Sequence, residues 1–187
     1  MRIGLLGGSF NPPHHGHMHI AKSALRRHKL HAVWWMVSPQ NPLKSKNDNF
    51  QKRFRMTRRY VAPHPKMIAT DIEQKMNIRY SYETIQKLKK RFPKTKFVWI
   101  AGMDNALVFH KWDKWRDLLR SIPFVFFNRP PNMMTLSSNV IRMYRGQKNV
   151  KWSIHGKTRN ISSTALRNKT IAKYLKNKIY SIYKERN

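Results

Sequence analysis

The chain has 187 residues, which suit one α/β domain with a proper hydrophobic core, and no repeat or low-complexity linker divides it, so we expect a single domain over residues 1–187. Its 39 Lys and Arg against 8 Asp and Glu give a formal net charge of +31, which indicates anionic ligands or contact with a polyanion. The absence of cysteine excludes disulfides, thiolate catalysis and cysteine metal sites. No signal peptide is evident and no apolar run approaches the ~18 residues of a membrane span, so we expect a cytoplasmic protein.

Apolar runs alternate with amphipathic stretches along the whole chain. The apolar runs predict strands over residues 2–7, 32–38, 67–70, 96–102, 122–128 and 150–155. The amphipathic stretches predict helices over residues 17–29, 49–62, 82–92, 112–120, 137–145, 163–168 and 170–184. This alternation predicts an α/β protein with a doubly wound, Rossmann-like parallel sheet and right-handed crossovers.

The segment from Gly7 to His17 joins the first predicted strand to the first predicted helix. A glycine-bearing turn before a helix N-terminus is suited to anions, because unpaired backbone N–H groups and the positive end of the helix dipole face the ligand. If the helix begins near Pro13 or His14, the rings of His14 and His17 can project from one face, with Gly16 between them. The turn therefore predicts a phosphate site, although such turns are often purely structural.

Two motifs at opposite ends of the chain resemble one superfamily. Residues 8–17, GSFNPPHHGH, resemble the G-[ST]-F-[DN]-P-x-H-x-G-H signature of the adenylyltransferases, and residues 161–167, ISSTALR, resemble their I-S-S-T-x-x-R signature. Between them, residues 41–44, 80–84 and 102–105, followed by Trp112, resemble the bacterial nicotinate-nucleotide adenylyltransferases in particular. The resemblance covers nearly the whole chain.

This resemblance implies adenylyl transfer from ATP to nicotinate mononucleotide, which yields nicotinate adenine dinucleotide (deamido-NAD) and pyrophosphate in NAD biosynthesis. Mg²⁺ is expected as the companion of ATP, and no dedicated metal cage is visible in the sequence. The residues with implied catalytic roles are His14, His17, Lys44 and Arg167. The residues implied to bind ATP are Gly8, Ser9, Phe10, His14, His17, Gly102, Asp104, Ile161, Ser162, Ser163 and Arg167.

The residues implied to bind the mononucleotide are Ser81, Tyr82, Thr84, Trp112 and Asp113. An indole at Trp112 would stack on the pyridine ring, and backbone N–H groups near Ser81, Tyr82 and Asp113 would favour a carboxylate over a carboxamide. Trp112 and Trp115 lie three apart in a predicted helix, so both could also be core residues; we assign Trp115 to the core and Trp112 to the ligand.

Asp104 follows a predicted buried strand and a glycine, where a carboxylate could accept a hydrogen bond from a ribose hydroxyl. The alternative is that it caps a helix beginning at Asn105. We favour the ligand role.

The chain departs from the usual family pattern at Asn11, where Asp is more frequent, at Ser81, where Thr is common, and at Asp113, where an aromatic residue often follows the tryptophan. Nicotinate specificity is thus less secure than adenylyl transfer, and a nicotinamide-mononucleotide or phosphopantetheine adenylyltransferase remains an alternative. An RNA-binding protein is a remote alternative, because the basic residues are spread along the chain without an RNA-binding signature. We expect no specific nucleic-acid partner, and a homo-oligomer is left open.

Overall fold

The computed structural model describes residues 1–39, 49–127 and 149–153. Within these residues a sheet of six parallel strands has the order β3-β2-β1-β4-β5-β6. The strands are β1 (Arg2–Gly8), β2 (Ala32–Val37), β3 (Met67–Thr70), β4 (Lys96–Gly102), β5 (Phe124–Phe127) and β6 (Val150–Ser153). This order is that of the doubly wound dinucleotide-binding sheet, so the predicted Rossmann-like α/β fold is confirmed.

The described helices lie close to their predicted ranges where the amphipathic signal is long. They are α1 (His15–Arg27), α2 (Phe50–Val61), α3 (Ile72–Lys75), α4 (Ser81–Arg91), α5 (Met103–Val108), the 3-10 helix η1 (Phe109–Lys111) and α6 (Trp115–Ser121). The short elements α3, α5 and η1 were not predicted, because elements of three to six residues hold too little periodicity to be recognised. The helices predicted over 137–145, 163–168 and 170–184 lie outside the described residues.

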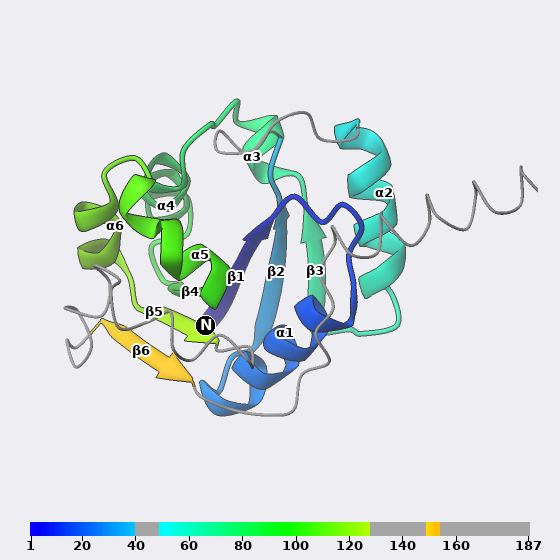
Figure 1. The fold of residues 1–187 in the computed structure, drawn as a ribbon, viewed down its shortest axis with the longest axis horizontal. Coiled ribbons are helices and arrows are strands. Elements are labelled where there is room, and N and C mark those ends of the chain that lie inside the picture. Colours follow the sequence, from blue (N-terminus) through cyan, green and yellow to red (C-terminus); the bar gives the residue numbers. More distant parts are fainter. Residues whose placement is uncertain (40–48, 128–148, 154–187) are drawn as a thin grey trace, which may run out of the picture.

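Side chains of strands β2, β4 and β5 alternate between two hydrophobic cores, one on each face of the sheet. In β5, Phe124 and Phe126 enter one core, and Val125 and Phe127 enter the other. Helices α3 to α6 cover the first core, whereas α1 and α2 cover the second (Figure 1). Because the sheet is buried on both faces, its strands read as near-continuous apolar runs, and each fully buried Phe contributes about 1.5–3 kcal/mol.

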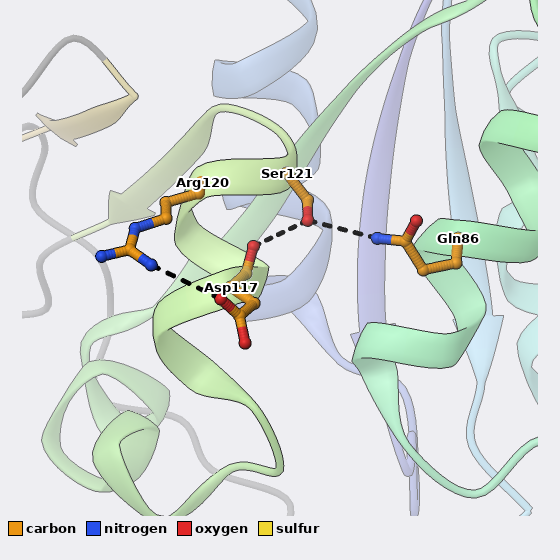
Figure 2. A network of polar contacts seen from close by, with 4 residues as sticks. All are labelled: Gln86, Asp117, Arg120 and Ser121. Atoms are coloured by element: carbon orange, nitrogen blue, oxygen red, sulfur yellow. Dashed lines mark hydrogen bonds and ion pairs between the residues drawn. The ribbon is translucent and has the colours of Figure 1, made fainter.

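Polar contacts at the surface join α4 to α6 on the first face. Gln86 Nε2 donates to Ser121 Oγ at 3.3 Å, and that hydroxyl donates to the carbonyl oxygen of Asp117 at 2.7 Å (Figure 2). Arg120 and Asp117 form an exposed ion pair at 3.5 Å. Such exposed contacts are individually weak, so the buried core residues of α4 and α6 hold this layer together.

The order of the strands indicates where a ligand would bind, because it reverses direction next to β1, at the switch point of the sheet. The chain runs from β1 to β2 on one side of β1 and returns to β4 on the other, so the carboxyl ends of β1 and β4 are neighbours. In open α/β sheets, ligands bind in the crevice at such a point. Gly8 and Gly102, where β1 and β4 end, therefore mark the candidate site. No described helix has the length and apolarity needed to cross a membrane.

Candidate active site

The turn between β1 and α1 is shaped by Gly8 and Phe10. Phe10 has a φ of 45°, in the left-handed region that few residues other than glycine adopt, and its ring is 1% exposed. The ring lies so near Gly8 that a Cβ at that position would come within 3.2 Å of it. A side chain at Gly8 would therefore press on the ring of Phe10, which forms the floor of the turn.

The two motif histidines cap helix α1 with their own side chains. Nδ1 of His14, the N-cap residue, accepts a hydrogen bond from the N–H of Gly16 at 3.1 Å. Nδ1 of His17 accepts one from the N–H of His14 at 3.3 Å. The rings stack with centroids 3.8 Å apart, so the expectation that both rings share one face is confirmed. This reciprocal pattern is that of a capping box, in which histidines replace the usual hydroxyl and carboxyl groups.

The capping bonds also set the tautomer of both rings. A ring nitrogen that accepts a hydrogen bond cannot carry a proton, so in each ring the proton of the neutral form resides on Nε2. In the neutral form His14 and His17 therefore each carry an Nε2–H, which is the form of the ring that can donate to a phosphate oxygen. Protonation of either ring would place an N–H of Nδ1 against a backbone N–H and break the cap.

His17 rests on two buried aromatic rings. Its ring meets Phe10 edge-on with centroids 5.0 Å apart and meets Trp35 at 6.2 Å, while Phe10 and Trp35 lie 5.1 Å apart. Trp35 is 0% exposed, whereas His17 is half-buried. Trp35 was not predicted as part of the site, since an apolar run does not show which of two adjacent indoles lies beneath it. The rings hold the imidazole in one orientation.

The first helical turn of α1 has features that suit the anion site predicted from the sequence, and binding there stays a prediction. The helix has 13 residues and no acidic residue in its first turn. The described residues of α1 and α2 contain no carboxylate side chain at all. The helix dipole and the cationic surroundings therefore both favour a polyphosphate at this end of the helix.

Across the switch point, Gly102 and Asp104 begin helix α5. The helix starts at Met103 and its N-cap residue is Gly102, so the alternative that Asp104 caps a helix beginning at Asn105 is wrong. Asp104 is exposed, and its Oδ1 would lie 2.5 Å from a Cβ on Gly102. The carboxylate folds back over the end of β4, where the site lies, and its contact with a ribose stays a prediction.

The predicted mononucleotide residues come from two segments that meet on the first face of the sheet. Ser81 and Tyr82 open helix α4, and Trp112 and Asp113 lie between η1 and α6. The ammonium group of Lys114 lies 5.3 Å from the centre of the Tyr82 ring and joins the segments. The structure therefore brings these predicted residues into one region.

Trp112 is not part of α6, contrary to the helix predicted over 112–120. The residue before α6, Lys114, has a φ of 46°, which separates the helix from η1. Trp112 directly follows η1, and its ring lies 4.9 Å from that of Phe109 and 5.9 Å from that of Trp99. Trp112 and Trp115 are both half-buried and pack against the first core, so the assignment of Trp115 to the interior holds only in part.

Thr84 lies behind the site, since its side chain is 0% exposed. Its hydroxyl donates to Oε1 of Glu73 on α3 at 2.9 Å and lies 3.2 Å from the carbonyl oxygen of Tyr80. Burial raises the pKa of Glu73 to about 7, and the hydrogen bond from Thr84 lowers it to a smaller extent. Thr84 therefore ties the start of α4 to α3, and a direct contact between its hydroxyl and a ligand does not fit this geometry.

Ser9 is placed as predicted, in the turn after β1, with its carbonyl oxygen bound by Arg53 at 2.9 Å. Sequence reasoning missed Arg53 and Glu73. The spacing of the sequence could have indicated that Arg53 is buried, because Thr57 and Val61 follow it four and eight residues later on the same helix face. All three residues are buried. The remaining predicted residues lie outside the described part of the chain; they are Lys44, Ile161, Ser162, Ser163 and Arg167.

The fold and the histidine-capped turn define a nucleotidyltransferase of Rossmann-like fold, and comparison with known proteins agrees. The cytidylyltransferase-like family matches residues 5–169 of this chain. The chain is 42% identical over 146 residues to a probable nicotinate-nucleotide adenylyltransferase of Cereibacter sphaeroides, a match that covers 77% of this chain and 78% of the relative. Its identity to a protein of the same description from Agrobacterium fabrum is 38% over 185 residues, which covers 90% of this chain and 98% of the relative. The chain belongs to the nicotinate-nucleotide adenylyltransferases of that family.

Solved structures show the same fold. A Plasmodium falciparum nicotinic acid mononucleotide adenylyltransferase complexed with NaAD superimposes with a TM-score of 0.75 at 19% identity, covering 89% of this chain and 82% of that chain. The same enzyme complexed with APC gives a TM-score of 0.73 at 18% identity with the same coverage. At this level of identity the likeness concerns the fold alone.

Proposed function

We propose that this protein transfers the adenylyl group of ATP to nicotinate mononucleotide and releases pyrophosphate. The observation that carries the proposal is the histidine-capped turn at the switch point, in a chain of the nicotinate-nucleotide adenylyltransferase family. In the neutral form both imidazoles carry their proton on Nε2 at a helix N-terminus with backbone N–H groups, and this combination of donors supports the binding of a triphosphate.

The reaction needs positioning and charge neutralisation more than a covalent partner. An oxygen of the mononucleotide phosphate forms a bond to the α-phosphorus of ATP, and the bond from that phosphorus to the oxygen bridging the α- and β-phosphates breaks. The attacking phosphate is already ionised at neutral pH, so no strong general base is required. Charge builds up on the oxygens of the five-coordinate phosphorus, where a fixed N–H donor lowers the barrier.

The proposed roles of His14, His17 and Asp104 follow from their places in the fold. His17 donates from Nε2 to the α-phosphate in the transition state, and His14 binds the triphosphate beside it. Asp104 accepts from a ribose hydroxyl of the adenosine. We propose that Lys44 holds phosphates and that Arg167 holds the leaving pyrophosphate, as the family resemblance implies.

Trp112 forms the wall for the pyridine ring, because its indole is half-buried and fixed against Phe109 and Trp99. Backbone N–H groups at the start of α4 and at Asp113 would recognise the carboxylate of nicotinate. Side-chain changes at Ser81 and Asp113 leave such backbone contacts intact, so we propose that this chain keeps nicotinate specificity.

We propose that Mg²⁺ enters with ATP as part of the substrate, because the triphosphate oxygens supply its ligands together with water. No group of three His, Cys, Asp or Glu side chains within the described ranges could hold a metal ion. We further propose a cytoplasmic enzyme that needs neither a membrane nor a nucleic acid to act.

The decisive experiment incubates the purified protein with ATP and Mg²⁺ and one acceptor at a time, and follows pyrophosphate release. Nicotinate mononucleotide should support turnover at a higher kcat/KM than nicotinamide mononucleotide, and phosphopantetheine should support none. Turnover with phosphopantetheine alone would replace the proposed acceptor, and no turnover with any acceptor would refute adenylyl transfer.

A further inference from the structure

A buried arginine on α2 joins two loops at the carboxyl edge of the sheet. Arg53 is 0% exposed. Its Nη1 donates to the carbonyl oxygens of Ser9 at 2.9 Å and Ser38 at 2.8 Å, and its Nη2 donates to the carbonyl oxygen of Pro39 at 2.7 Å. Ser9 belongs to the turn after β1, and Ser38 and Pro39 belong to the loop after β2, so one side chain holds both loops.

The sequence of α2 places this side chain inside. Asn49 caps the helix by accepting the N–H of Gln51, and Arg53 lies in the first turn on the face that Thr57 and Val61 continue. The hydroxyl of Thr57 donates to the carbonyl oxygen of Arg53 at 2.8 Å. The guanidinium group thus sits where the helix meets the ends of β1 and β2, at a position that an apolar residue would normally occupy.

Only arginine suits this set of acceptors. The guanidinium is planar and carries five N–H donors in a fixed fork, so it can serve three carbonyl oxygens at once, whereas a lysine ammonium is a compact point charge on a flexible stem. The ring of Phe50 lies 5.6 Å from the guanidinium carbon and adds a cation–π contact. The hydrogen bonds to neutral carbonyl oxygens fix backbone geometry, which an ion pair with a carboxylate would not do.

We propose that Arg53 is a positioning residue for ATP, which holds the backbone of the phosphate turn after β1 against the loop after β2. The inference rests on the proposed function and adds to it a buried residue that fixes the backbone of the histidine-capped turn. The N–H of Ser38 also donates to the carbonyl oxygen of Gly8 at 3.0 Å, so the two loops leave the sheet side by side and Arg53 closes the gap between them one residue further on.

Loss of the fork should therefore affect ATP more than the mononucleotide. Arg53→Lys keeps the positive charge but loses the simultaneous hydrogen bonds to three carbonyl oxygens. Because this loss should displace the reacting groups slightly, we expect kcat/KM for ATP to fall by about 10- to 100-fold. The KM for nicotinate mononucleotide should stay within about twofold, because the Trp112 region lies on the other face of the sheet. Arg53→Met, which removes the charge as well, should be at least as severe.

The matched controls are Arg55→Lys and Arg55→Met, since Arg55 is an exposed arginine on the same helix. Both should leave the ATP parameters unchanged. A lower melting temperature of Arg53→Lys with unchanged KM and kcat for ATP would show a purely structural role and overturn the proposal.

A measurement on the unsubstituted protein covers the case in which the Arg53 variants do not fold. The guanidinium ¹⁵N–H signals of a buried arginine can be followed by NMR in protein labelled with ¹⁵N-arginine. Addition of ATP with Mg²⁺ should shift the Arg53 signals, and addition of nicotinate mononucleotide alone should leave them in place. If ATP raises the melting temperature but leaves the Arg53 signals unchanged, Arg53 is not a positioning residue for ATP.

The two proposals fail in different ways. If the unsubstituted protein releases no pyrophosphate with any acceptor, adenylyl transfer is wrong. The role of Arg53 in ATP binding is then still decided, by the NMR shifts and by the thermal stabilisation that ATP gives to the unsubstituted and Arg53→Lys proteins.

Discussion

The two halves of the site are built in different ways. On the β1–β2 side, polar side chains are buried and committed to defined backbone partners: His14 is 4% exposed and caps α1, and Arg53 is 0% exposed and binds three carbonyl oxygens. On the β4–β5 side, half-buried Tyr82, Trp112 and Trp115 pack against the first core.

This contrast matches what each half would bind. Stabilising charge on a phosphorus centre requires donors that are already fixed before the reaction, because reorganising them would cost part of what they contribute. Holding a flat ring requires apolar surface of the right shape, and the directions of hydrogen bonds matter less. We therefore expect substitutions on the β1–β2 side to reduce turnover and those on the β4–β5 side to reduce affinity.

The largest effect is expected at His17. His17→Ala removes the Nε2–H donor of the transition state, and kcat should fall by about two orders of magnitude or more while the fold stays intact. The measurement is steady-state pyrophosphate release together with thermal unfolding. His19→Ala, a histidine on the same helix outside the motif, is the matched control, and near-normal turnover of His17→Ala would remove His17 from the mechanism.

A smaller effect, on binding, is expected at Trp112. Trp112→Ala should weaken the mononucleotide by about 1–3 kcal/mol, on the scale of a base stacked on an aromatic side chain, and change the KM for ATP less. Trp115→Ala is the control, since both indoles are half-buried against Phe109. If both variants lower the melting temperature and neither changes the KM for the mononucleotide, Trp112 is only a packing residue.

A third effect concerns stability behind the β4–β5 half. Burial raises the pKa of Glu73 from an ordinary 4.5 to about 7, so the folded state binds more protons than the unfolded state between these values. The stabilising contribution is therefore complete below about pH 4.5 and is lost as the pH rises through 7, with a slope of at most about 1.4 kcal/mol per pH unit.

Glu73→Gln should remove this dependence and keep an oxygen that accepts from Thr84. The variant should be more stable than the unsubstituted protein by up to about 3 kcal/mol at pH 8, in denaturant titrations at several pH values. Glu83→Gln, at an exposed carboxyl group on α4, is the control. Parallel pH profiles of the unsubstituted protein and Glu73→Gln would show that Glu73 does not titrate in this way.

The smallest effect is expected at the surface contact of Figure 2. Gln86→Ala removes the hydrogen bond between α4 and α6 at an exposed position and should change the free energy of unfolding by less than about 0.5 kcal/mol. Leu88→Ala, on the same helix but 1% exposed, should cost about 2–5 kcal/mol. Comparable costs would mean that the polar contacts, and not the core, hold the helical layer of the β4–β5 half.

The amino-acid sequence by itself determined the sheet and the position of the phosphate turn. Strands β1 to β4 lie within one residue of their predicted ranges, because a sheet buried on both faces requires apolar runs with turn residues at their ends. The pairing of His14 and His17 was also predictable, since residues three apart near a helix start share a face.

The tertiary structure alone decided how the site is supported. A left-handed residue at Lys114 separates Trp112 from α6, and burial turns Thr84 from a ligand candidate into a partner of Glu73. Arg53 meets carbonyl oxygens 14 to 44 residues away, a contact that no local pattern encodes. Periodicity reports which face of an element is buried, but which polar groups meet inside depends on how distant elements pack.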